Sequence, residues 1–85
     1  SIISNNKAFY LVTTEEKKVS DYIMNTLGHG TTVFGVKGGF VAKRKDAILT
    51  VVPTRDYYRV TEGIRMIDPK AFFLATDSYE VKGAD

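Results

Sequence analysis

Hydrophobic and polar positions along this chain follow the order strand, helix, strand, and then repeat that order once. Short runs of β-branched and aromatic residues at 7–13, 31–36, 47–52 and 71–76 predict four strands. Between the strands of each pair, apolar residues recur at spacings of three and four, which predicts two amphipathic helices. The run at 47–52 is almost unbroken, so we expect it to be a central strand covered on both sides.

The ends of the two predicted helices carry recognisable signals. The first follows residues 13–16, Thr-Thr-Glu-Glu, a capping-box pattern whose first Thr is the expected cap, and it stops at Gly28. The second has Thr54 as its expected N-cap and ends before Pro69. Gly63 weakens this helix, and a close approach to the sheet would explain its presence. The predicted apolar stripes are Val19, Tyr22, Ile23, Thr26 and Leu27 in the first helix, and Tyr57, Val60, Thr61, Ile64 and Ile67 in the second.

Two strand-helix-strand units in tandem predict an α+β fold, the ferredoxin-like βαββαβ sandwich. In this fold a four-stranded antiparallel sheet carries both helices on one face. A short C-terminal edge strand is expected through Tyr79 and Val81. Residues 1–6 are interpreted as a linker or a non-native remnant, and residues 7–85 as a single domain.

The face of the predicted sheet that the helices leave uncovered is a candidate interface. Adjacent residues of a strand point to opposite faces, so the aromatic residues cannot all be buried under the helices. The residues concerned are Phe9, Tyr10, Phe34, Phe72 and Phe73. We therefore expect a homo-oligomer, a dimer or a trimer, that forms through the sheet.

Composition excludes several classes of function. The chain has no cysteine, which rules out disulfides, thiol catalysis and thiolate metal sites. A net charge of +2 is too small to indicate nucleic-acid binding, and residues 47–52 lack the aromatic signature of RNA-binding sheets. No apolar stretch is long enough to span a membrane, and no signal peptide is recognisable at the start.

A basic, glycine-containing hairpin loop at residues 37–45 is the feature closest to a binding site. Paired glycines let backbone N–H groups converge on an anion, and the basic side chains add charge and hydrogen-bond donors. The residues concerned are Lys37, Gly38, Gly39, Lys43, Arg44 and Lys45. A phosphate-bearing ligand could bind there, but the pattern alone favours a hairpin whose basic residues are merely solvated. The spacing does not match a P-loop.

A second small cluster, His29 and Gly30, lies between the first helix and the second strand. The imidazole is a candidate ligand contact, but catalysis is not predicted because no nucleophile or metal partner accompanies it. The carboxylates near the C-terminus are irregularly spaced, so no metal site is predicted. No cofactor is predicted either.

Four short motifs in order carry a resemblance to a known family. They are Gly-His-Gly-Thr-Thr at 28–32, Gly-Val-Lys-Gly-Gly-Phe at 35–40, Ile-Asp-Pro-Lys-Ala-Phe at 67–72, and Asp-Ser-Tyr-Glu-Val-Lys-Gly at 77–83. Together they resemble the soluble C-terminal domain of YitT-type bacterial membrane proteins. The chain departs from the family at 41–42, where Val-Ala replaces the usual Thr-Gly.

This resemblance implies a domain of unknown function on the cytoplasmic side of the membrane, attached to a multi-pass membrane protein. It also implies a shape similar to the PII and ACT regulatory domains. The expected function is a non-enzymatic regulatory domain that binds a nucleotide or another anionic metabolite at the loop, near subunit interfaces. The alternative is a structural oligomerisation domain that binds no small molecule.

Overall fold

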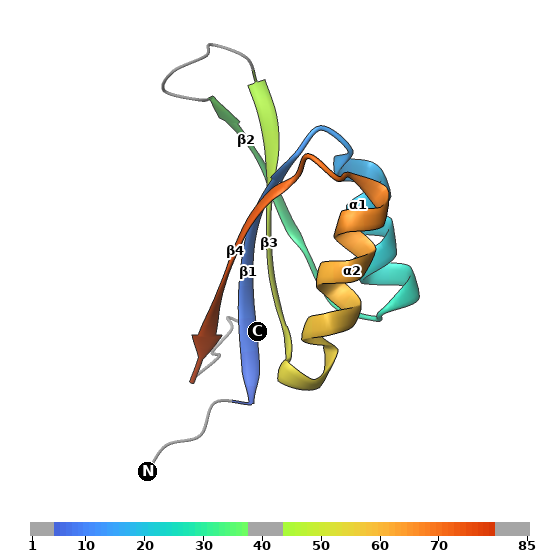
Figure 1. Ribbon diagram of the computed structural model, residues 1–85. Helices are drawn as coiled ribbons and strands as arrows, with labels where there is room; N and C mark the ends of the chain where they lie inside the picture. Colours follow the sequence, from blue (N-terminus) through green and yellow to red (C-terminus); the bar gives the residue numbers. More distant parts are fainter. Residues whose placement is uncertain (1–4, 38–43, 80–85) are drawn as a thin grey trace.

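The computed structural model describes residues 5–37 and 44–79, and these form two layers. An antiparallel sheet of four strands forms one layer, and the helices cover one of its faces (Figure 1). The strand order is β2-β3-β1-β4, and β3 is central as predicted. The expectation that β3 is covered on both sides is wrong, because the helices cover one face of the sheet and leave the other open (Figure 1). The strands are β1 (Asn6–Thr13), β2 (Thr32–Lys37), β3 (Arg44–Pro53) and β4 (Phe72–Ser78). The predicted ferredoxin-like α+β fold is confirmed.

The helical layer consists of two helical segments, and each changes its type along its length. α1 (Glu16–Asp21) continues as a π-helical segment, η1 (Tyr22–Thr26). A 3-10 turn, η2 (Thr54–Asp56), leads into α2 (Tyr57–Ile67). Thr54 was expected to be the N-cap of the second helix, and this is wrong because Thr54 lies inside the 3-10 turn. Its N–H donates to the Asn5 carbonyl at 2.8 Å.

Thr13, the expected N-cap of the first helix, is instead the last residue of β1. A tertiary contact occupies its hydroxyl group, which donates to the buried carboxylate of Asp68 at 2.6 Å. The same oxygen accepts the N–H of Glu15 at 2.9 Å, and not the N–H of Glu16 that a capping box requires. The helix therefore begins later than predicted, with Glu15 at the N-cap position.

The core lies between the sheet and the helices. Alternate residues of β1 and β3 point toward the helices and are fully buried there. The core cluster comprises Phe9, Leu11, Val19, Ile23, Ile48, Val52, Val60 and Ile64. Thr26 was predicted to belong to the first apolar stripe, but it is exposed because the π-helical turn shifts it away from the core.

The two helical segments touch at Gly63, so the reason for this glycine is contact between helices and not contact with the sheet. A Cβ atom placed on Gly63 would overlap the ring of Tyr22. The Tyr22 hydroxyl donates to the Arg59 carbonyl at 2.8 Å, which holds the ring across α2. The π-helical turn that starts at Tyr22 thus packs directly against the backbone of α2.

Candidate functional site

The basic loop is shorter than the sequence predicts, because the strands continue into it. Lys37 pairs with Arg44, and Val36 pairs with Lys45, so β2 ends later and β3 begins earlier than expected. The hairpin extends past the helices, where no packed element interrupts the pairing of its strands (Figure 1). The predicted site residues Gly38, Gly39 and Lys43 lie outside the described part of the chain.

His29 and Gly30 lie at the opposite end of β2 from this loop (Figure 1). A strand of this length separates its two ends by roughly 17 Å. The structure therefore does not bring these two residues together with Lys37, Arg44 and Lys45.

His29 connects the segment before β2 to the turn before α2. Its Nε2 atom lies 2.7 Å from Oδ2 of Asp56, and the two side chains are largely buried. This hydrogen bond lowers the pKa of Asp56, and the nearby Arg59 guanidinium lowers it further. The carbonyl of Gly30 accepts the hydroxyl of Thr50 at 2.7 Å. Both residues thus hold the connection between η1 and β2 in place. Nε2 of the imidazole already has Asp56 as its hydrogen-bond partner.

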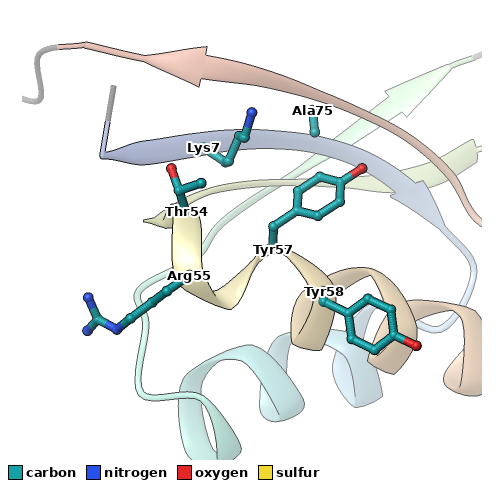
Figure 2. Close-up of a pocket in the computed structure, with 6 residues that line it drawn as sticks. All are labelled: Lys7, Thr54, Arg55, Tyr57, Tyr58 and Ala75. Carbon is teal, nitrogen blue, oxygen red and sulfur yellow. The ribbon is translucent and has the colours of Figure 1, made fainter. Parts of the chain in front are cut away.

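A hollow on the helical side of the sheet is a feature that sequence reasoning missed. It has a volume of about 420 Å³ and lies between the start of β1, the β3–α2 connection and β4. The residues that line it are Lys7, Thr54, Arg55, Tyr57, Tyr58 and Ala75 (Figure 2). Because they come from three separate parts of the chain, no contiguous motif could have indicated the hollow.

The small side chain of Ala75 explains why this hollow is open. Ala75 pairs with Phe9, and its neighbours on the same face of β4 are Phe73 and Asp77. The Phe73 ring packs on Phe9 with centroids 6.2 Å apart, and Asp77 binds Lys7. A methyl group between two larger side chains leaves space above the sheet, and the Tyr57 ring borders that space, 5.7 Å from the Phe9 ring.

Lys7 places a positive charge in the wall of the hollow. Its Nζ atom donates to Asp77 at 2.5 Å and lies 5.9 Å from the centroid of the Tyr57 ring. The hydrogen bond to Asp77 raises the pKa of Lys7, so the ammonium group stays charged at neutral pH. Arg55 adds a second positive charge, and it takes part in none of the ion pairs found among the described residues.

The uncovered face of the sheet is the other candidate surface. Phe9 and Phe73 face the helices, whereas Tyr10, Phe34 and Phe72 point away from them, so the aromatic residues are divided between the two faces, as expected. The side chains of Tyr10, Phe34, Phe72 and Leu74 are 48%, 47%, 68% and 56% exposed.

The strand alternation also shows that this uncovered face carries no charged residue among the positions whose side chains are described. Those positions are Asn6, Ala8, Tyr10, Val12, Thr32, Phe34, Ala47, Leu49, Val51, Pro53, Phe72, Leu74, Thr76 and Ser78. In the whole chain, 26% of residues are charged. We call this surface the open face.

No group of three or more His, Asp or Glu side chains that could hold a metal ion occurs among the described residues. Within residues 5–37 and 44–79, no helix combines the length and the apolar character that a membrane crossing requires. The candidate sites are the hollow around Lys7, the open face and the basic end of the β2–β3 hairpin.

These features define an α+β domain of the ferredoxin-like class, with a largely apolar open face and a basic, aromatic hollow. A family model described as "Uncharacterized protein conserved in bacteria (DUF2179)" matches residues 29–83. The chain belongs to this family.

Two relatives in Bacillus subtilis (strain 168) are named as membrane proteins. The UPF0750 membrane protein YdeO is 30% identical over 98% of this chain, and the UPF0750 membrane protein YvjA is 22% identical over 94%. The chain spans only 29% and 28% of their respective lengths, and 52% of an uncharacterised relative from Bacillus sp. (strain PS3). The predicted relation to a family of membrane proteins is confirmed, while the C-terminal position and the cytoplasmic side stay predictions.

Solved structures support the fold. A DUF2179 protein from Eubacterium ventriosum has a TM-score of 0.70 at 21% identity and covers 84% of this chain and 97% of its own. A functionally unknown protein from Pediococcus pentosaceus has a TM-score of 0.81 at 12% identity, covering 96% of this chain and 100% of its own. At these identities the likeness concerns the fold alone.

Proposed function

We propose that this chain is a non-enzymatic regulatory domain, attached to a membrane protein on the cytoplasmic side, and that it self-associates through the open face. The observation that carries the proposal is the set of four exposed large side chains on that face, together with the absence of charge from the positions whose side chains are described. By register, Lys45 at the hairpin end is a further position of the same face. Burying apolar surface of this kind is favourable by about 25 cal/mol per Å².

The size of the open face suits a small specific interface. Four strands about 4.8 Å apart, each with about seven residues, give a surface on the order of 20 Å by 20 Å. If the face is treated as flat, two copies would bury roughly 800–1,000 Å² in total. This area is near the lower limit for specific interfaces. We therefore expect a reversible association and not a permanent one.

A second copy of the chain is the occupant that the charge distribution favours. A nucleic acid or an anionic membrane surface would be recognised by several basic residues, and the strand register gives the open face a single basic position among the described residues, Lys45 at the hairpin end. In a symmetric pair each copy presents the same surface, so the part of it whose side chains are described buries no unpaired charge.

Analytical ultracentrifugation of the wild-type chain over a dilution series tests the proposal. From about 1 mM to about 1 μM we expect the mass to fall from that of a dimer or trimer to that of a monomer. Amide hydrogen exchange should slow for the strands of the sheet at the higher concentration. A monomer at every concentration would show that the open face is not an interface of this kind.

A second candidate function, binding of a phosphate-bearing metabolite such as a nucleotide, rests on the end of the β2–β3 hairpin. The register places Lys37 opposite Arg44, with Lys45 in the preceding pair, so three basic residues occupy the last two backbone pairs. This concentration of positive charge supports anion binding at the hairpin end.

Thermal denaturation in the presence of nucleotides tests the second candidate. A ligand at 100 times its Kd adds about 2.7 kcal/mol to the free energy of unfolding, which should raise Tm by roughly 10 °C. The variant Arg44→Gln/Lys45→Gln should lose this shift, and the control Lys17→Gln/Lys18→Gln, on the exposed side of α1, should keep it. A shift that survives in the Arg44/Lys45 variant would place the ligand elsewhere.

A further inference from the structure

The hollow around Lys7 combines groups that recognise two different parts of a ligand. The Tyr57 and Tyr58 rings are both exposed and offer flat apolar surfaces for stacking, and the Lys7 and Arg55 side chains offer positive charge. Thr54 adds a hydroxyl group beside Lys7 (Figure 2). Ala75 contributes no bulk on the β4 side, so the space remains open.

We propose that this hollow is a binding site for a small organic anion that carries a flat ring, of the chemical class of nucleoside monophosphates. The anionic group lies against Lys7 and Arg55, and the ring lies on the exposed tyrosines. The volume of about 420 Å³ is within the range of small-molecule sites.

Lys7 is a well-placed anchor because the structure fixes its position. Its backbone belongs to β1, which pairs with both β3 and β4, and its ammonium group is held by Asp77 and lies over the Tyr57 ring. A cation that is already ordered loses little conformational entropy when it binds a ligand. Arg55 is exposed and points away from Lys7 in Figure 2, so its side chain must turn to reach the anionic group.

Asp77 controls how tightly the hollow binds an anion. Its carboxylate neutralises part of the Lys7 charge and stands beside the position of an incoming anion. An anion must therefore compete with Asp77 for Lys7, which weakens its binding. Removal of this carboxylate should have the opposite effect from removal of Lys7, and a purely structural ion pair would not produce that opposition.

The hollow is independent of both proposals made for the function. Lys7 and Ala75 point to the helical side of the sheet, away from the open face. The hairpin end lies at the other end of β3, roughly 26 Å away if measured along the strand. Failure at one of these sites thus leaves the others untouched.

An NMR titration of the 15N-labelled chain with AMP tests the inference. We expect AMP to shift the amide signals of Lys7, residues 54–58 and Ala75. Adenosine and inorganic phosphate should each bind at least about tenfold more weakly than AMP, because each lacks one of the two recognised parts.

Three variants make the test specific. Lys7→Gln should weaken AMP binding about tenfold, and Asp77→Asn should strengthen it severalfold. The control Lys17→Gln removes the same charge from an exposed position on α1 and should leave the affinity unchanged. Dispersed spectra of the free variants verify that each is folded.

Several results would overturn the inference. One is an absence of shifts at the hollow, and another is an affinity that Lys7→Gln and Lys17→Gln reduce equally. Phosphate that binds as tightly as AMP would mean that the ring is not recognised. Shifts confined to the β2–β3 hairpin would reject the hollow and favour the second candidate function.

Discussion

Replacing Leu74 by glutamate is expected to abolish self-association of the domain. Leu74 lies on β4 directly opposite Tyr10 and is 56% exposed on the open face. In an oligomer formed through this face, the new carboxylate would be buried without a partner, because none of the described positions around it is charged. The desolvation of an unpaired carboxylate costs several kcal/mol, so the association constant should fall by at least about 100-fold.

Met66→Glu is the matched control for this substitution. Met66 is 84% exposed on α2, so the control also replaces an exposed apolar side chain by glutamate, but on the helical layer. Sedimentation velocity at one concentration should show a monomer for Leu74→Glu and wild-type behaviour for Met66→Glu. If both variants dissociate, net charge and not the open face controls the assembly, and if neither does, the interface lies elsewhere.

Gly63→Ala is expected to destabilise the domain by about 2 kcal/mol, although alanine is the better helix former. Helix propensity alone would favour alanine by about 1 kcal/mol. The added methyl group, however, would overlap the Tyr22 ring. Overpacking typically costs 1–3 kcal/mol, and a displaced ring also loses its hydrogen bond to the Arg59 carbonyl, about 1 kcal/mol more.

The same substitution should change sign when the Tyr22 ring is absent. In the Tyr22→Ala background the overlap disappears, so Gly63→Ala should stabilise the domain by roughly 0.5–1 kcal/mol. Urea denaturation of the wild type, the two single variants and the double variant measures this coupling. A stabilising effect of Gly63→Ala in the wild-type background would contradict the close packing of η1 against α2.

Local sequence patterns predicted the order of elements and the class of fold. The β-branched and aromatic run at Phe9 and Leu11, and the unbroken run of β3, predicted strands because such side chains pack well on a pleated sheet. The alternation of side chains along a strand predicted that the five aromatic residues of the strands could not all be covered by the helices. These properties depend on neighbours a few residues apart, which the sequence displays directly.

Features that depend on contacts between residues distant in the sequence were decided by the tertiary structure. Thr13 bonds to Asp68 instead of capping a helix, and His29 bonds to Asp56 instead of facing an open site. Spacing along the chain could not indicate either partner. The reach of β2 and β3 into the basic loop likewise follows from backbone pairing between the two strands, which local propensity does not determine.

The open face and the hollow also differ in how far the sequence could predict them. The sequence showed that some large apolar side chains of the strands must lie on the uncovered face, because adjacent residues of a strand point to opposite faces. The hollow exists only because Lys7, the turn before α2 and Ala75 meet in the folded chain. Its position was therefore decided by the packing of the helical layer on the sheet, and its chemistry by which side chains that packing brings together.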